Sequence, residues 1–303
     1  MTATLDNTTT SLPWLDSLLQ QIAGTRVTRP IAVFDCDGTI IKGDIGEAMF
    51  FNQFEQGLFR VSPADVWPDY PEKNTLDRLF REMKSRDAQA AIEFAKLLLD
   101  WYFGQLKQGK TAKACSDIVR LLSGFSVEEV RTHARETLNV DLHSPVAHRS
   151  LGGYSLPKGI RYIRETVDIL RRLVDSNFEL WVISGSNRWA VEAVFSPFGV
   201  PTDRIIGIEA IETGGILTSE IREPVPVLQG KVEILRKLLP NRPEIVLSDS
   251  LRYDLPLLEE ASHVRVHVLS NPHDNRNNVD TQIAPWVQLK EISYINGTHP
   301  WQM

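Results

Sequence analysis

An apolar run that ends in two aspartates constrains this chain most. Residues 31–39 read IAVFDCDGT, so four apolar side chains lead directly to Asp35, and Asp37 follows. A short apolar run bounded by turn formers is typical of a buried strand in a parallel sheet. Ligands of open α/β sheets bind at the carboxyl ends of the strands. The sequence therefore predicts a ligand site at the end of this strand.

The residue types at this strand end favour a small divalent cation. Two carboxylates one residue apart raise each other's pKa, and a cation relieves the repulsion. Oxygen ligands in a small site suit Mg²⁺. Gly38 permits a tight turn, and Thr39 adds a hydroxyl. An ordinary Asp-Gly turn at a strand end is the alternative interpretation.

Two later segments carry polar residues that suit an anionic ligand. After the apolar run 178–183, Ser184 and Gly185 precede a predicted helix, whose first N–H groups can hold phosphate oxygens. Ser186 as a simple cap of that helix is the alternative. Lys231 lies at a predicted helix N-terminus, where a cation opposes the helix dipole, so we expect it to face an anion. An exposed surface lysine is the alternative.

A second apolar strand also ends in carboxylates. Residues 245–248 lead to Asp249, and Asp254 follows shortly after it. This pattern repeats that of the first strand and adds acidic side chains at a strand end. A capping role for Asp254, at a helix predicted to start near Leu255, is the alternative.

Taken in order, the four segments resemble the four motifs of the haloacid dehalogenase (HAD) superfamily, whose first motif reads D-x-D-G-T. The resemblance covers residues 31–269 and implies a Rossmann-like α/β core. It implies that Asp35 is a covalent nucleophile and that Asp37 is a general acid and base. The residues with implied roles are Asp35 and Asp37 for catalysis, Ser184, Gly185 and Lys231 for phosphate binding, Asp35, Asp37 and Asp249 for Mg²⁺, and Thr39 and Asp254 as supports.

The chain length and the periodicity together predict two domains. At 303 residues the chain exceeds the usual size of one domain. Residues 46–139 show helical periodicity without a good strand, whereas strands alternate with helices from residue 157 onwards. We expect an α/β core with a mostly parallel sheet from residues 1–43 and 153–303, and a helical cap domain from residues 44–152.

The position of the cap extends the resemblance. A helical insert between the first and second motifs is similar to the cap of the phosphoserine phosphatase branch, which implies that the insert covers the active site. Gly43 and Gly152-Gly153 flank the insert. Because glycines can absorb backbone rotation, we expect the insert to close over Asp35 as a body.

Several further elements follow from the sequence pattern. Residues 205–218 are predicted to form two strands that turn at Gly214-Gly215. Helices are predicted over residues 11–22, 160–174 and 255–261 from the spacing of their apolar positions.

The composition argues against several classes of partner. The net charge is −6 and no basic block is present, so nucleic acid and anionic membrane surfaces are not expected partners. Cys36 and Cys115 are too few for a disulfide framework. No secretion signal and no run of membrane-spanning length are visible, so we expect a cytoplasmic protein.

The combined pattern predicts a Mg²⁺-dependent phosphomonoesterase that acts on a small phosphorylated metabolite through an aspartyl-phosphate. A phosphomutase of the same superfamily is one alternative. A non-catalytic phosphate-binding protein on the same fold is the other. The intact set Asp35, Asp37 and Lys231 favours an enzyme. The sequence does not determine the oligomeric state.

The residues after the first motif bear on the substrate. In phosphoserine phosphatases a Glu at the position of Asp44 contacts the amino group of the substrate, so Asp44 and Glu47 imply a cationic head group. The substrate would then be phosphoserine-like or a phosphorylated amino alcohol. Ile118 stands where those enzymes carry the arginine that binds the serine carboxylate, which weakens the case for phosphoserine. Simple capping of the first cap helix by Asp44 and Glu47 is the alternative.

Overall fold

The predicted strand at residues 31–34 lies in the middle of a six-stranded sheet. The structure is a computed structural model, and it describes residues 12–24, 29–270 and 286–296. The strands lie in the order β12-β11-β10-β1-β6-β7, and every neighbouring pair is parallel. Their bounds are β1 Ile31–Phe34, β6 Glu179–Asn187, β7 Ile205–Ile208, β10 Ile245–Ser248, β11 Val264–Val268 and β12 Trp286–Leu289.

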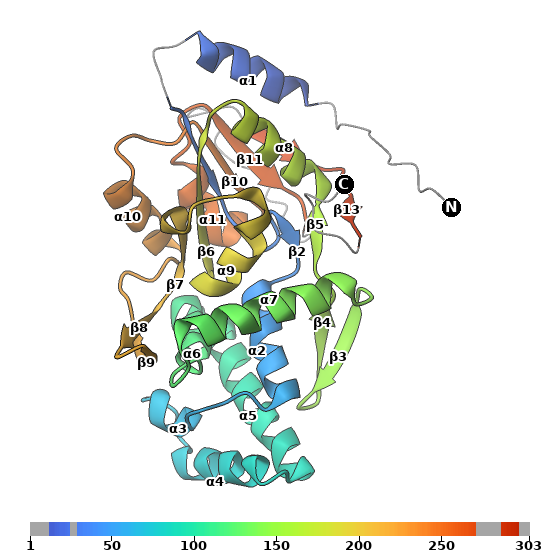
Figure 1. Ribbon diagram of the computed structural model, residues 1–303, viewed down its shortest axis with the longest axis vertical. Helices are drawn as coiled ribbons and strands as arrows, with labels where there is room; N and C mark the ends of the chain where they lie inside the picture. The colour runs from blue at the N-terminus through green and yellow to red at the C-terminus, as the bar shows by residue number, and fades with distance from the viewer. Residues whose placement is uncertain (1–11, 25–28, 271–285, 297–303) are drawn as a thin grey trace.

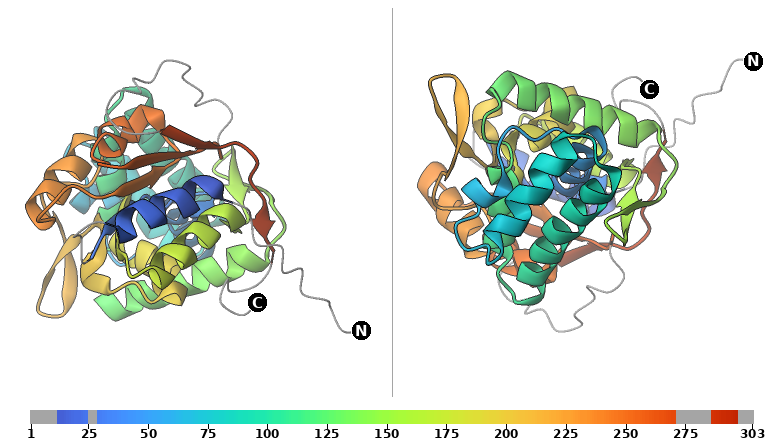
Figure 2. Two further views of the ribbon diagram at one scale, coloured as in Figure 1. Left: turned by 90° about the horizontal axis from the view of Figure 1, so that it is seen from above. Right: turned by 90° about the horizontal axis from the view of Figure 1, so that it is seen from below.

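Successive side chains of a strand point to opposite faces of this sheet, and a layer of helices packs on each face. Ala32 and Phe34 of β1 pack with α1, α8 and α9, whereas Ile31 and Val33 pack with α10 and α11. Figure 2 shows α1 and α8 running side by side over one face. The helix bounds are α1 Pro13–Ala23, α8 Arg164–Asp175, α9 Arg188–Phe195, α10 Gln229–Leu238 and α11 Leu251–Leu258, and two short 3₁₀ turns cover Ser196–Phe198 and Thr202–Arg204. This α/β architecture confirms the predicted fold class.

Residues between strands β2 (Ile41–Lys42) and β3 (Ala147–Leu151) are mainly helical, as the sequence predicts. Figure 1 shows these helices below the sheet, with α4 at the far end. Aromatic side chains fill their shared interior; for example, the rings of Phe59 and Phe94 meet edge to face at 5.5 Å. The bounds are α2 Ile45–Gln56, α3 Pro63–Val66, α4 Lys73–Lys84, α5 Ala88–Lys107, α6 Thr111–Arg120 and α7 Val127–His143.

The helical region shares part of its core with the sheet domain. Met49 of α2, Val119 of α6 and Leu138 of α7 belong to the same apolar cluster as the helices α1, α8 and α9. The Leu217 amide donates to the Phe125 carbonyl, and the Gly124 amide donates to the Leu217 carbonyl, both at ordinary distances. These contacts join the α6–α7 connection to strand β9 (Ile216–Ile221) by main-chain hydrogen bonds.

A hairpin follows α7 that the sequence pattern did not indicate. Strands β3 (Ala147–Leu151) and β4 (Tyr154–Lys158) pair in antiparallel fashion around Gly152-Gly153. The backbone of Gly152 lies so close to α5 that an added Cβ would be 2.5 Å from the Lys96 amide nitrogen. The glycine pair is therefore the turn of this hairpin, packed on α5, and the predicted division at residues 152/153 falls within that turn.

Three predicted elements differ from the observed ones in part. The segment expected as a helix from residue 160 first forms β5 (Arg161–Ile163), which pairs with β2 (Ile41–Lys42) and β13 (Tyr294–Ile295). The helix expected from Leu255 begins at Leu251, because the Ser250 side chain caps it. In the segment 205–218, β7 joins the main sheet, and the hairpin consists of β8 (Ala210–Thr213) and β9 (Ile216–Ile221).

The remaining predictions for these regions agree with the described residues. Helix α1 begins at Pro13, within the predicted range, and Ser11 lies outside the described residues. None of the helices in the described ranges is long and apolar enough to cross a lipid bilayer.

Candidate active site

The carboxyl ends of β1, β6 and β10 meet, and Asp35 lies at the first of them. Its side chain is 5% exposed. The Lys231 ammonium, at the start of α10, donates to Asp35 Oδ1 at 2.8 Å and to Asp254 Oδ2 at 2.8 Å. Lys231 is itself 5% exposed, so the alternative of a surface lysine is wrong. The lysine is held between two carboxylates and keeps one ammonium proton for a further acceptor.

Hydroxyl groups from β6 hold Asp37. Ser184 Oγ donates to Asp37 Oδ2 at 3.1 Å, and Ser186 Oγ donates to the same oxygen at 2.7 Å. The main-chain amide of Ile45, the first residue of α2, donates to Asp37 Oδ1 at 2.8 Å. Asn187 caps α9, so the alternative role of Ser186 as that cap is wrong. Ser186 is a site residue that the sequence prediction missed.

Asp249 closes the site from β10. The Thr39 hydroxyl donates to Asp35 Oδ2 at 3.2 Å and accepts the Asp249 amide at 2.9 Å, so it bridges two strand ends. Ser270 Oγ donates to Asp249 Oδ2 at 3.3 Å. Asp254 accepts Ser248 Oγ at 2.8 Å and is not the cap of α11. Thr39 and Asp254 thus contact the carboxylates and the lysine, as a supporting role requires.

Burial and crowding of acidic groups raise the pKa values of these carboxyls. Burial raises the pKa of Asp37 to about 7, and the nearby Asp44 adds to the rise. Burial also raises the pKa of Asp35, which Lys231 opposes, and burial together with the Asp35 charge raises that of Asp249. Burial lowers the pKa of Lys231, but Asp254 and Asp35 outweigh that effect, so its pKa is raised.

The donor set fits Mg²⁺ through two carboxylates. Asp35 and Asp249 stand at neighbouring strand ends, and a cation between them would favour the ionised form of both. Both oxygens of Asp37 accept hydrogen bonds, and so do both oxygens of Asp35, so these bonds do not distinguish the two residues as ligands. Within the described ranges, no group of three or more Asp, Glu, His or Cys side chains is arranged to hold a metal ion. Mg²⁺ is usually bound by one or two carboxylates, with waters and substrate phosphate completing its shell.

Residues of α2, α5 and α6 also line this pocket, together with Asp44 before α2. Asp44 caps α2 by accepting the Glu47 amide at 2.7 Å, which agrees with the capping alternative for Asp44 alone, and it also accepts Ser186 Oγ at 3.4 Å. Glu47 Oε1 accepts the Tyr102 hydroxyl of α5 at 2.8 Å. Burial raises the pKa of Asp44 to about 7, and Glu47 adds to the rise. Capping and a place in the site are therefore compatible for Asp44.

The structure brings nearly all of the sequence-predicted residues together around one cavity of about 640 Å³. Only Thr39 lies behind its wall, fully buried. The predicted residues that line the cavity are Asp35, Asp37, Asp44, Glu47, Ser184, Gly185, Lys231, Asp249 and Asp254. Tyr102, Cys115, Ser186, Arg252 and Ser270 also line it and were not predicted. Tyr102 and Cys115 among them lie on α5 and α6. These helices are far from the four motifs in sequence, so no local pattern indicated that the two residues belong to the site.

Gly38 is expected to tolerate no side chain. Its φ is +73°, and an added Cβ would be 2.1 Å from Asp249 Oδ2. Gly38→Ala should lower the unfolding free energy by roughly 2 kcal/mol or more, because backbone strain and a clash coincide. Gly57→Ala is the matched control, since Gly57 has φ +63° with nothing within 4 Å of an added Cβ. Urea unfolding of both variants measures the difference, and equal losses would contradict the close approach of Asp249.

Comparisons with known proteins test the family prediction. The sequence matches the model of the haloacid dehalogenase-like hydrolases over residues 32–259. A search of the curated proteins found no match. A conserved protein of unknown function from Anaerococcus prevotii DSM 20548 has a similar structure, with a TM-score of 0.66, 17% identity, and coverage of 88% of this chain and 86% of that chain.

Two other solved structures resemble this one. A protein of unknown function from Bordetella pertussis Tohama I has a TM-score of 0.53 at 17% identity, over 82% of this chain and 93% of that chain. A phospho-aspartyl intermediate analogue of phosphoserine phosphatase has a TM-score of 0.42 at 15% identity, over 86% of this chain and 94% of that chain. At such identities the similarity concerns the fold. The matched residues include all four motifs and the strand ends that carry them, and the chain therefore belongs to the haloacid dehalogenase-like hydrolases.

Proposed function

We propose that this hydrolase is a Mg²⁺-dependent phosphomonoesterase that acts on a small phosphorylated metabolite through an aspartyl-phosphate. One observation carries the proposal: Asp35 is held by Lys231 at a strand end, with the hydroxyl-bonded Asp37 close by in the same cavity. A carboxylate positioned by a cation, beside a second carboxyl near neutral pKa, is the arrangement that nucleophilic and acid–base steps need.

In the proposed reaction an oxygen of Asp35 attacks phosphorus and the bond to the leaving alcohol breaks. Asp37 gives its proton to the leaving oxygen and then takes a proton from the water that hydrolyses the aspartyl-phosphate. A pKa of about 7, raised mainly by burial, suits Asp37 for both transfers. The two steps together consume one water and release inorganic phosphate.

The phosphate oxygens would be held by groups that already surround Asp35. Lys231 has one ammonium proton left after its bonds to Asp35 and Asp254. Ser184 bonds to Asp37 here, so binding phosphate would require its hydroxyl to turn, while Gly185 lies in the cavity wall. Mg²⁺ held by Asp35 and Asp249 would add positive charge at the phosphate.

Release of p-nitrophenol from p-nitrophenyl phosphate, with and without Mg²⁺, tests the proposal. We expect hydrolysis that requires Mg²⁺. Transfer of the phosphoryl group to a second metabolite without release of phosphate would favour the phosphomutase alternative. Phosphate binding without any turnover would favour a non-catalytic binding protein.

Asp249→Ala is expected to raise the Mg²⁺ concentration for half-maximal activity at least about tenfold, because one of two carboxylate ligands is lost. Ca²⁺ should inhibit the wild type, since its larger and looser shell does not keep the in-line geometry. Asp175→Ala, on the exposed end of α8, is the control. Full activity of the wild type in excess chelator would contradict the metal assignment.

We also propose that residues 44–152 act as the cap domain, and that the cap selects a cationic head group. Asp44 and Glu47 place two acidic side chains in the wall of the cavity that also holds Asp35. Arg120 of α6 is occupied by Asp117 and by the Ser219 carbonyl, and it does not line the cavity. Lys42 and Arg252 do line it, so a phosphorylated amino alcohol and a phosphoserine-like substrate, whose carboxylate needs a cation, both fit the proposal. The two free cysteines support a reducing, cytoplasmic compartment.

Asp44→Ala should raise KM for a phosphorylated amino alcohol about tenfold or more, because a charge-assisted contact is lost, and should leave p-nitrophenyl phosphate hydrolysis nearly unchanged. Asp87→Ala is the matched control, because Asp87 caps α5 through the Ala90 amide at 2.9 Å and lies outside the cavity. Steady-state kinetics with the phosphorylated amino alcohol and with p-nitrophenyl phosphate measures how differently the substitution affects the two substrates. Equal losses on both substrates would mean that Asp44 acts only as the cap of α2.

A further inference from the structure

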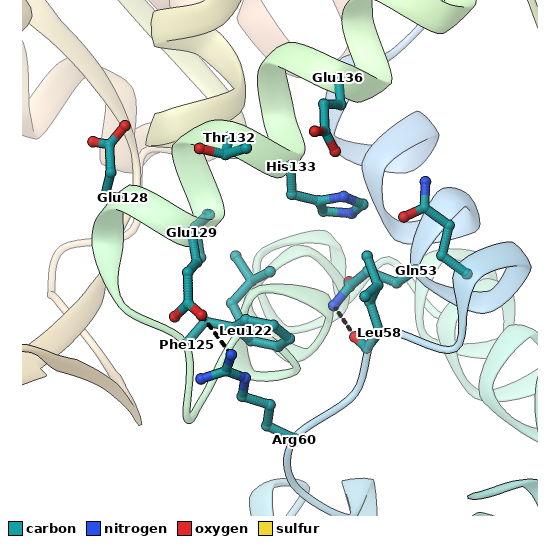
Figure 3. Close-up of a pocket in the computed structure, with 12 residues that line it drawn as sticks. Gln53, Leu58, Arg60, Leu122, Phe125, Glu128, Glu129, Thr132, His133 and Glu136 are labelled. Carbon is teal, nitrogen blue, oxygen red and sulfur yellow. Dashed lines mark hydrogen bonds and ion pairs between the residues drawn. The ribbon is translucent and has the colours of Figure 1, made fainter.

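A second cavity lies between α2 and α7, apart from the active site. Its volume is about 380 Å³, within the range of small-molecule sites, and it shares no lining residue with the cavity that holds Asp35. Figure 3 shows that its residues come from α2, α7 and the connections at Leu58–Arg60 and Leu122–Phe125. Apolar side chains form part of its wall, namely those of Leu58, Leu122, Phe125 and Val130.

A buried imidazole lines this cavity, and its two ring nitrogens are themselves almost fully buried. His133 of α7 is 9% exposed. Its ring is near the Met49 carbonyl, but neither ring nitrogen makes a hydrogen bond of normal geometry with the described residues. Burial lowers the pKa of His133, so the neutral ring offers one donor and one acceptor. Buried polar groups without partners are uncommon, and a bound ligand is one way to satisfy them.

The charges around this cavity favour a cation over an anion. The only cationic side chain of its wall, Arg60, donates to Glu129 at 2.5 Å and stacks on the Phe125 ring at 4.5 Å. Glu128 is paired with Arg135 at 2.7 Å. Glu136 forms no ion pair within the described residues, and Figure 3 shows its carboxylate close above the His133 ring. One carboxylate is therefore available beside the imidazole.

We propose that the cavity between α2 and α7 binds a small organic ammonium ion with an apolar body. The ammonium group bonds to the Glu136 carboxylate, and a turn of the His133 ring, whose nitrogens are buried here, brings its acceptor nitrogen to the same group. The apolar body lies against Leu122 and Val130. Charge-assisted hydrogen bonds of this kind provide selectivity for the amine over a neutral molecule of the same shape. This site is independent of the phosphatase chemistry proposed above.

Binding of three probes to the full chain tests the proposal. Benzylamine carries an ammonium group, benzyl alcohol is its neutral counterpart, and phenylacetate is an anion of similar size. Ligand-observed NMR titration should give a dissociation constant for benzylamine about tenfold below that for benzyl alcohol, and no saturation with phenylacetate. Tighter binding of phenylacetate, or no saturation with benzylamine at tens of millimolar, would overturn the proposal.

Variants then locate the bound amine. Glu136→Gln changes a residue on the exposed side of α7 and should weaken benzylamine binding about fivefold or more. His133→Phe should weaken binding to a similar extent, because phenylalanine fills the same buried volume but offers no acceptor nitrogen. Glu128→Gln is the matched control and should leave binding unchanged. Because Asp44 is itself proposed to bind a cationic head group, the titrations are repeated in the Asp44→Ala background, which removes that contact from the active site. In this background Glu136→Gln should still weaken benzylamine binding about fivefold or more, and unchanged binding there would overturn the assignment.

Discussion

Asp35→Asn is expected to lower kcat by at least about 10⁴-fold, the scale seen when a nucleophile that acts with its neighbours is removed. Asp35 is the carboxylate that Lys231 holds at the end of β1, and no other residue of the cavity combines that position with that contact. The amide cannot form the acyl phosphate. Turnover of p-nitrophenyl phosphate measures the loss, and retention of more than a few per cent of wild-type kcat would refute the role of Asp35.

The fold should survive this substitution. Burial raises the pKa of Asp35, so its ionised form is costly in the folded state, and the neutral amide removes that cost. Lys231 keeps its bond to Asp254. We expect the unfolding free energy to stay within about 1 kcal/mol of wild type. Asp35→Glu is the matched control: it keeps the charge but moves the oxygen, and should still lose about 10²-fold in kcat.

Trapping of the intermediate provides a second readout. Wild-type protein quenched during turnover and reduced with borohydride should carry its modification at Asp35, because an aspartyl-phosphate is an activated acyl group. Asp35→Asn should carry none. A modification at Asp249 or Asp37 in the wild type would move the nucleophile to that residue.

The motifs could be predicted from sequence because their signals are local. The apolar run of β1 and the polar residues that follow it are adjacent in the chain, and a parallel sheet brings such strand ends together. The same reasoning predicted that Ser184 and Asp249 lie near Asp35, and both line the cavity that holds it. The position of Lys231 also followed from a local rule, since a lysine at a helix start opposes the helix dipole.

Residues that depend on tertiary contacts could not be predicted in this way. Ser186 and Asn187 are both good helix caps, and only the fold turns Ser186 toward Asp37 and leaves the cap to Asn187. Tyr102 lies far from the motifs in sequence and reaches Glu47 through the packing of α5 on α2. Neither the contact of Ser186 with Asp37 nor that of Tyr102 with Glu47 produces a periodic pattern or a motif in the sequence.

The β3–β4 hairpin was missed for a related reason. Its strands are short and largely exposed, so they lack an apolar run. Asp141, which is 2% exposed, anchors the segment by accepting Arg149 at 3.1 Å and the Gly159 amide at 3.2 Å. The predicted closure of the cap as a body stays a prediction, and Gly152-Gly153 forms the turn of this hairpin.

Lys231→Met is expected to lower the unfolding free energy by about 3 kcal/mol at pH 8, because it removes the cation that contacts the buried carboxylates of Asp35 and Asp254. Asp35 and Asp254 would then face each other without compensation. Burial raises the pKa of Asp35 and Lys231 opposes that rise, so in the folded variant the pKa of Asp35 would lie further above its unfolded value and the folded state would bind a proton more tightly. The loss should therefore shrink as the pH falls from 8 towards 5. Urea unfolding in chelator at both pH values measures it.

Two further variants separate charge compensation from packing. Lys237→Met, in the exposed pair of Lys237 with Glu233 on the same helix, should change stability by less than about 0.5 kcal/mol. The double variant Lys231→Met with Asp254→Asn removes one stranded carboxylate and should recover part of the lost stability without recovering turnover, because the phosphate still lacks its ammonium partner. The idea of charge compensation would be contradicted if Lys231→Met lowered the unfolding free energy equally at pH 5 and pH 8 and the double variant recovered none of it. Lys231 would then stabilise the fold through packing of its aliphatic side chain rather than through its charge.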